Sequence, residues 1–306
     1  MARLICVAAR VVVLMGVLFY PNPVRASRMI PDDNLAYPVL ITFQNSATRM
    51  TEYASGFYLR DDTYFYLVTA THVLFDQIKQ KELNSAKEET VFVLKAQKLQ
   101  TLSYLRNPKA PGRAKLSLDI GELDRLKKIK RHNTHDVTVV RLGTINLVSG
   151  EVAVNFESNA VTIEEWATPG PVVVAPSTVK KFDDVLTSND IYIFGYPRSL
   201  GIPEIPQIDY EVPLLRKGIL AGKNNKQKFL IIDCPIYPGN SGGPVMEVEV
   251  LSPGSFSYRI IGVVTQFVPF AEIWENKTQK YSNVQLSNSG YGVAVPMDMV
   301  LELLKD

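Results

Sequence analysis

The segment "PIYPGNSGGPV" places Ser241 among glycines: Gly239 lies two residues before it, and Gly242 and Gly243 follow it. A serine hydroxyl attacks a carbonyl only where a base removes its proton and backbone N–H groups can hold the developing oxyanion. Glycines keep side chains away from such backbone. The same glycines are typical of a tight turn, so the role of Ser241 depends on partners elsewhere in the sequence.

The candidate bases are few, because the sequence holds 3 histidines, His72, His132 and His135, and all of them precede Ser241. "GNSGG" also matches the G-x-S-x-G pattern of α/β-hydrolases, but in those enzymes the histidine follows the serine. The subtilisin order needs an acid before the histidine and a parallel sheet, which the pattern of strands does not support. The order histidine, acid, serine remains.

His72 ends the apolar run "YLVTATHVLF", where the small residues Ala70 and Thr71 allow the backbone to turn and present the ring. A lone histidine is more often structural, and only the surrounding pattern weakens this alternative. His132 belongs to the basic run "RLKKIKRH", for which we predict a solvated loop.

Asp136 opens the alternating run "HDVTVVRL", in which a strand can bury the carboxylate while the following residues enter the core. The competing acids Asp119 and Asp124 do not lead directly into such a strand. His135 is a rival base, but adjacent strand residues face opposite sides. If Asp136 faces the site, His135 does not.

Short apolar and β-branched runs between turn signals predict strands in most of the chain. Many short strands without long helices between them favour an antiparallel barrel or sandwich. The turn "LSPGS" predicts a hairpin. Helices are expected over 75–89 and over 297–306, with Asp298 as the cap of the second. The predicted strands are 37–44, 54–60, 64–70, 90–96, 114–120, 135–142, 191–197, 228–234, 243–250, 258–267 and 291–296.

The composition limits the possible partners. The 306 residues are 46% hydrophobic and 21% charged, which is enough for a sizeable core, and the net charge is only +2. Nucleic acid is therefore not expected as the main partner, since its binding usually needs a basic face.

Residues 1–26 have the layout of a secretory signal peptide. Two arginines precede the apolar run "VVVLMGVLFY", and Val24 and Ala26 are the small residues before the expected cleavage. An uncleaved anchor helix is the alternative, although the run is short for a membrane span. The prediction is an exported protein, periplasmic or secreted, that meets the membrane only transiently through this peptide.

Cysteine use fits a fold without disulfides. Cys6 lies in the predicted signal peptide, which leaves Cys234 alone in the mature chain. We expect Cys234 to be a small buried apolar residue. A catalytic thiol is not expected, because no histidine follows it or closely precedes it.

The segments "SGFYL", "TATHV", "HDVTVVRL", "FGYPRSLG", "PGNSGGPV", "GVVTQF" and "GYGVAVP" follow one another as in chymotrypsin-fold serine peptidases. The sequence is most similar to the disulfide-free bacterial trypsin-like branch, which includes the protease domains of HtrA/Deg enzymes. The resemblance covers most of residues 35–304. It implies an all-β fold of two six-stranded antiparallel β-barrels with a C-terminal helix. One peptidase domain would span 27–306, with its halves meeting at roughly 150–185.

The resemblance also implies roles for single residues. His72 would act as general base and then acid, Asp136 would orient it, and Ser241 would attack. The backbone N–H groups of Gly239 and Ser241 would form the oxyanion hole, and Thr265 would support Asp136 and line the cleft. No metal or cofactor is implied. The substrate pocket would be lined by Pro235, Ile236, Thr265, Gln266, Phe267 and Gly292.

These residues predict an endopeptidase acting on proteins or peptides. Pro235 and Ile236 at the base of the pocket carry no charge, and Phe267 should narrow it. We therefore expect cleavage after small or medium apolar residues such as Ala, Val or Leu. A trypsin-fold binding protein or a latent peptidase is the alternative, and an esterase on the same fold is a third possibility.

The sequence also departs from the pattern of the family. Asn240 stands where pancreatic-type enzymes carry the Asp that pairs with a new N-terminus, so activation by zymogen cleavage is not expected. No PDZ domain follows the predicted peptidase segments, so regulation through such a domain is not expected either. The segment 268–289, which contains Phe270 and Trp274, is expected to be either an ordinary surface loop or a gate beside the pocket.

Overall fold

The structure is a computed structural model. It describes residue 30 and residues 33–81, 88–104, 112–148, 151–167, 170–198, 204–276 and 278–305. The predicted signal peptide and its cleavage site lie outside these residues. In the described ranges, no helix is long and apolar enough to cross a membrane.

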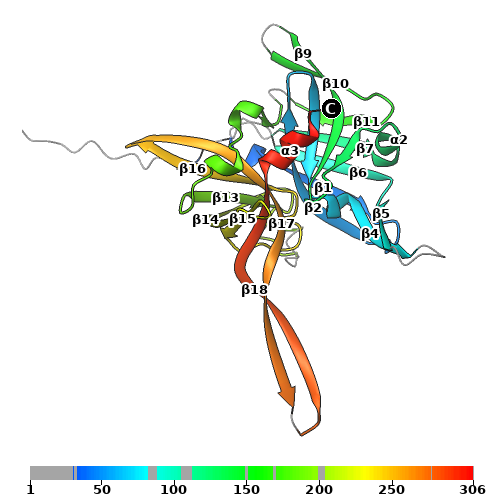
Figure 1. Cartoon of the computed structure of the whole chain (residues 1–306). Coiled ribbons are helices and arrows are strands. Elements are labelled where there is room, and N and C mark those ends of the chain that lie inside the picture. Colours follow the sequence, from blue (N-terminus) through cyan, green and yellow to red (C-terminus); the bar gives the residue numbers. More distant parts are fainter. Residues whose placement is uncertain are drawn as a thin grey trace, which may run out of the picture.

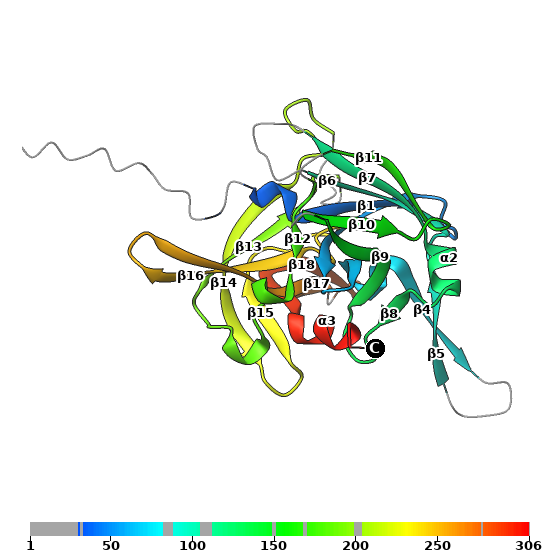
Figure 2. The same ribbon diagram turned by 90° about the horizontal axis from the view of Figure 1, so that it is seen from above.

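The N-terminal half is a curled sheet that has ten strands within the described residues, rather than the predicted six (Figure 2). Its main order is β10-β9-β3-β2-β1-β6-β7-β11, with β8 beside β9 and β12 beside β2. Among the described strand pairs of this sheet, only β12 and β2 are parallel. Because a short turn joins β10 to β11, the two ends of this order lie close together. The bounds are β1 (Pro38–Gln44), β2 (Thr51–Arg60), β3 (Tyr64–Thr69), β6 (Lys98–Tyr104), β7 (Arg113–Asp119), β8 (Ile129–Arg131), β9 (Thr138–Val148), β10 (Glu151–Phe156), β11 (Val161–Trp166) and β12 (Val173–Val174).

The C-terminal half is a closed antiparallel barrel in the order β13-β14-β15-β18-β17-β16, which confirms the prediction for this half. Alternate residues of these strands, such as Ile191, Ile193, Leu230 and Ile232, fill its interior. The helix α3 (Met297–Leu303) follows the barrel (Figure 1). The strands are β13 (Asp190–Gly195), β14 (Leu214–Asn224), β15 (Phe229–Asp233), β16 (Pro244–Ser252), β17 (Ser255–Asn276) and β18 (Tyr281–Pro296).

The two halves share one apolar core. Phe57 and Val68 from the first half pack in one cluster with Phe194, Val263 and Val295 from the second, and all five side chains are buried. Each fully buried side chain of this size contributes about 1.5–3 kcal/mol. The shared core therefore fixes the position of one half against the other, which a site built from both halves requires.

The prediction of a helix over 75–89 is wrong. After the single turn α1 (Thr71–Leu74), the chain continues as β4 (Phe75–Lys81), which pairs with β5 (Glu88–Leu94). The Lys- and Glu-rich composition favours a helix locally, but tertiary contacts decide otherwise. The rings of Phe75 and Phe92 meet edge to face at 6.5 Å, and the Arg131 guanidinium lies 4.8 Å and 4.2 Å from their centres.

The C-terminal helix is present as expected, but Asp298 does not cap it. Pro296 occupies the N-cap position. The carboxylate of Asp298 instead accepts the backbone N–H of Phe182 at 2.7 Å, which ties α3 to the segment between the halves. That segment contains η2 (Pro176–Thr178) and η3 (Phe182–Asp184), and η1 (Asn34–Ala36) precedes β1. The unpredicted helix α2 (Ile120–Arg125) is capped by Asp119, whose side chain accepts the N–H of Glu122.

The hairpin predicted at "LSPGS" is confirmed, since Ser252 pairs with Ser255 and Gly254 has a φ of 81°. The segment 268–289, expected to be a loop, is a second and longer hairpin. It continues β17 and β18 beyond the barrel and stands away from the rest of the molecule (Figure 1).

Candidate active site

His72 and Asp136 meet at the end of the β3–β9 strand pair, where Thr69 lies opposite Thr138. One oxygen of Asp136 accepts the backbone N–H of His72 at 3.0 Å, and the other lies 2.5 Å from Nδ1 of the ring. With the Nδ1 proton directed at the carboxylate, Nε2 is left unprotonated in the neutral ring. This is the tautomer that a general base needs.

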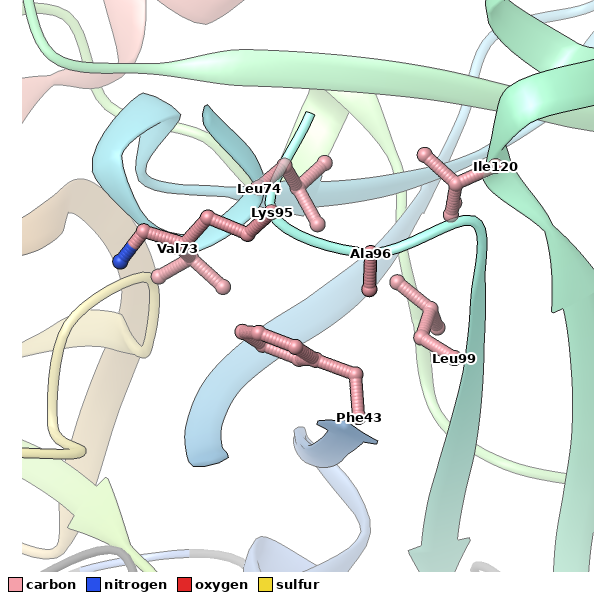
Figure 3. Close-up of a pocket in the computed structure, with 7 residues that line it drawn as sticks. All are labelled: Phe43, Val73, Leu74, Lys95, Ala96, Leu99 and Ile120. Atoms are coloured by element: carbon pink, nitrogen blue, oxygen red, sulfur yellow. The ribbon is translucent and has the colours of Figure 1, made fainter. Parts of the chain in front are cut away.

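Two features hold the short helix α1 that carries His72. The hydroxyls of Thr71 and Thr138 share a buried hydrogen bond of 2.9 Å, which joins α1 to β9. On the other side, Val73 and Leu74 face an apolar cavity that also involves Phe43, Leu99 and Ile120 (Figure 3). The cavity measures about 10 Å³, which is close to the minimum for one water molecule. It is therefore a packing defect behind the site rather than a place for a substrate.

The loop that carries Ser241 begins with a tight turn. The N–H of Asn240 donates to the carbonyl of Tyr237 at 3.0 Å, and Gly239 has a φ of 93°, as expected for a turn with proline and glycine at its centre. The buried Asn240 amide accepts the N–H of Tyr237 and donates to the carbonyl of Phe194. A neutral side chain therefore ties this turn to the barrel.

The next residues press against the N-terminal half. The carbonyl of Ser241 accepts the N–H of Ser55 at 3.0 Å, and the hydroxyl of Ser55 donates to the carbonyl of Gly239 at 2.8 Å. A Cβ on Gly242 would lie 2.1 Å from the carbonyl oxygen of Ser55 and 3.0 Å from the nitrogen of Ala70. Since Ala70 is two residues before His72, this contact brings the serine loop next to the histidine.

The hydroxyl of Ser241 donates to the backbone carbonyl of Thr265 at 3.2 Å. The hydrogen bond between nucleophile and base is often long in a free enzyme and tightens when substrate binds. Among the described residues, neither the N–H of Gly239 nor that of Ser241 donates to an acceptor of the protein.

Most of the residues predicted for the pocket lie together where β17 and β18 leave the second barrel. Phe267 pairs with Gly292 across β17 and β18, and the hydroxyl of Thr265 donates to the carbonyl of Val293. A Cβ on Gly292 would lie 2.4 Å from Cγ1 of Ile236. Ile236, which is 1% exposed, therefore occupies the space that Gly292 leaves.

Gln266 is exposed and pairs with Val293, Phe267 is 38% exposed, and Pro235 is half-buried. Cys234 is buried, and burial raises the pKa of its thiol to about 11. The thiol is thus protonated at neutral pH. Within the described residues, no group of three or more His, Cys, Asp or Glu side chains could hold a metal ion.

His132 has a role at the site that the sequence did not predict. Its Nδ1 accepts the backbone N–H groups of Thr134 and His135 at 3.2 Å and 3.1 Å, and its own N–H donates to the carbonyl of Val137. Nε2 lies 3.3 Å from a carboxylate oxygen of Glu302 on α3. The side chain is 13% exposed rather than solvated. His132 thus organises the turn that presents Asp136.

The turn around His132 resembles those that Asn and Asp form by accepting N–H groups two and three residues ahead. Histidine is not a usual residue for this task, so local sequence gives no signal for it. Nε2 of His135, the rival base, lies 3.0 Å from the carbonyl oxygen of Gln227, and the His135 ring contacts Phe229.

The all-β fold agrees with the chymotrypsin-like fold that the sequence predicted. The family model described as "Trypsin-like peptidase domain" matches residues 54–249, more than half of the 306 residues. The chain belongs to this family.

Comparison with solved structures gave distant similarities. The HtrA-type protease AlgW with tripeptide is 15% identical with a TM-score of 0.43, and the match covers 89% of this chain and 60% of that one. The serine endoprotease from Yersinia pestis is 17% identical with a TM-score of 0.42, and the match covers 89% of this chain and 65% of that one. The Rv3671c protease from M. tuberculosis in its active form is 13% identical with a TM-score of 0.41, and the match covers 88% of this chain and 80% of that one. The chain thus spans less than two thirds of the length of the first two structures. No curated protein sequence matched.

Replacing Gly242 with alanine should abolish cleavage of labelled casein and destabilise the fold, because the new Cβ would meet backbone of the other half. Gly254→Ala is the matched control. Its φ of 81° is close to the 87° of Gly242, but no described atom lies within 4 Å of its Cβ position. It should therefore cost only the left-handed strain of about 1–2 kcal/mol. Urea unfolding and cleavage rates compare the two, and equal effects would contradict the close contact.

His132→Ala should lower kcat by roughly 10–100-fold with little change in KM, since small displacements of a catalytic group cost about this much. His132→Asn should recover most of the loss, because an Asn side chain accepts the same type of N–H groups in turns. Steady-state kinetics on a peptide substrate test this pair. Equal kcat values for the Ala and Asn variants, or a loss confined to KM, would contradict the positioning role.

Proposed function

We propose that this protein is an exported serine endopeptidase that cleaves peptide bonds through an acyl-enzyme intermediate. The observation that carries the proposal is the double contact of Asp136 with the N–H and Nδ1 of His72. This contact fixes the ring in one orientation and leaves Nε2 to act as the base. The position of the Ser241 loop against Ser55 and Ala70 supports the same assignment.

The reaction follows from these positions. Nε2 of His72 takes the proton of Ser241 as Oγ bonds to the substrate carbonyl carbon, and Asp136 stabilises the imidazolium that results. The N–H groups of Gly239 and Ser241 hold the oxyanion. His72 then gives its proton to the leaving amine as the peptide bond breaks. A water molecule, deprotonated by His72, releases the acyl group from Ser241.

A latent peptidase or binding protein is the second candidate, and one observation favours it. The hydroxyl of Ser241 donates to Thr265 rather than to the His72 ring. If this arrangement persists with substrate, the base cannot take the proton. The two candidates therefore differ in whether Ser241 reacts.

The export part of the proposal rests on the N-terminal sequence alone. The arginines, the apolar run and the small residues Val24 and Ala26 support a cleaved signal peptide. A mature chain that starts near Ser27 has Cys234 as its only cysteine. It needs no disulfide formation in an oxidising compartment.

A fluorophosphonate probe tests the proposed function. We expect it to label wild-type protein, collected from the exported fraction with a first residue near Ser27, and not to label Ser241→Ala or His72→Ala. Asp136→Asn should cleave peptides about 10⁴-fold more slowly than wild type. An unlabelled but folded wild type would favour the latent protein. An Asp136→Asn rate within about tenfold of wild type would make Asp136 the wrong acid, and an intact Met1 on membrane-embedded protein would refute export.

Ile236 should set the specificity of the pocket, because its side chain fills the space beside Gly292. The wild type should cleave after Ala or Val, and less readily after Leu. Ile236→Ala should raise kcat/KM for Leu or Phe at this position at least tenfold relative to Ala, since each added methylene is worth about 1–3 kcal/mol. Phe267→Ala, on the exposed wall, is the control and should change this ratio less. Cleavage of peptide libraries by each variant measures these preferences. Dominant cleavage after Arg, Lys or Glu would contradict the apolar specificity predicted for this pocket.

A further inference from the structure

The hairpin formed by residues 268–289, called the arm here, has no partner strand within the described structure. Its strands pair with each other from Pro269–Asn288 to Asn276–Tyr281. The pairing of β17 with β16 ends at Val263, and that of β18 with β15 ends at Tyr291. Both outer edges of the arm are therefore open, as its position in Figure 1 illustrates.

Each face of the arm carries large exposed apolar side chains. Residues directly opposite one another in an antiparallel pair share a face, so Ile273 and Val284 lie on one side together with Leu286, at 67%, 55% and 64% exposure. Phe270 and Trp274 lie on the other side at 55% and 63%. An isolated two-stranded hairpin is at best marginally stable in water, and an apolar patch of this kind marks an interaction surface. The arm therefore needs a partner.

The two edges differ in how well they are protected. The β17 edge carries Pro269, Glu272 and Glu275, and proline and charge both discourage pairing with another strand. The β18 edge over 281–288 reads "YSNVQLSN" and contains neither a proline nor a charged residue. Of the two unpaired edges, only that of β18 therefore lacks protection against pairing with a new strand.

The chemistry of the arm argues against two other occupants. Insertion into a bilayer would carry the polar tip, with Glu275 and Lys280, through the apolar layer first. A substrate peptide that continued along β17 from the pocket residue Phe267 would meet the protected edge rather than the open one. Neither a lipid surface nor an extended substrate matches the side that is free.

A second copy of this chain does match the open edge. In an antiparallel pair of β18 edges with a twofold axis at Gln285, Val284 of each copy lies opposite Leu286 of the other. Asn283 faces Ser287 and Ser282 faces Asn288, so no like charges meet. Such self-complementarity is what a twofold interface requires. The two hairpins then form one four-stranded sheet. A sheet needs three or more strands to be stable on its own, and a single hairpin has only two.

We propose that the arm is a dimerisation element in which the β18 edges of two copies pair antiparallel over residues 281–289. The pairing covers a strand edge that could otherwise pair with other chains and lead to aggregation. It does not depend on the proposed peptidase activity.

Two matched variants test the edge. Leu286→Lys introduces charge on β18 beside the proposed axis, whereas Ile273→Lys introduces it on β17, on the same face and at nearly equal exposure, 67% against 64%. Sedimentation velocity over a concentration series should show a dimer for the wild type and for Ile273→Lys, and at least tenfold weaker dimerisation for Leu286→Lys. A monomeric wild type would overturn the proposal, as would equal weakening by both variants, which would indicate packing through the faces.

A shortened arm gives a second measurement. Replacing residues 270–287 with a short turn leaves the barrel pairs from Val263–Val295 to Phe267–Gly292 in place. The shortened protein should be monomeric and should still label with the fluorophosphonate probe if Ser241 reacts in the full chain. A shortened protein that still dimerises, or a wild type that binds lipid vesicles instead of itself, would refute the role of the arm.

Discussion

The contact of Gly242 with the backbone of Ser55 is the constraint on which the rest of the site depends. His72 and Asp136 are supplied by one sheet and Ser241 by another, so their distances are set by how closely the two halves approach. That approach is limited by a position where a Cβ would lie 2.1 Å from a carbonyl oxygen. The shared core of Phe57, Val68 and Val263 holds the halves at this distance. Both features are therefore needed to hold the residues of the two halves in this arrangement.

Hydrogen bonds between uncharged groups help to fix the elements around His72, Asp136 and Ser241. The amide of Asn240 joins the turn before Ser241 to Phe194, and the paired hydroxyls of Thr71 and Thr138 join α1 to β9. His132 does the same for the turn before Asp136 through two backbone N–H groups.

The sequence predicted much of the site because its signals are local. His72 at the end of an apolar run and Asp136 at the start of an alternating one are now seen within hydrogen-bonding distance. Where the prediction was wrong, the deciding contacts are distant in sequence. The segment 75–89 has a helical composition, but Phe92 and Arg131 make it a strand. The part played by His132 depends on a turn whose chemistry is usually that of Asn or Asp.

The strands β17 and β18 link the shared core to the arm. Val263 and Val295 on these strands belong to the core, Phe267 and Gly292 pair farther along them, and both strands then continue into the arm. Two side chains fix the root of the arm: Asn288 donates to the carbonyl of Ile236, and Ser289 donates to that of Val268 at 2.6 Å. The hydrogen bond from Asn288 thus joins the root of the arm to Ile236, whose side chain fills the space beside Gly292. If two copies pair along β18 as we propose, the paired segment includes Asn288, the donor of this hydrogen bond.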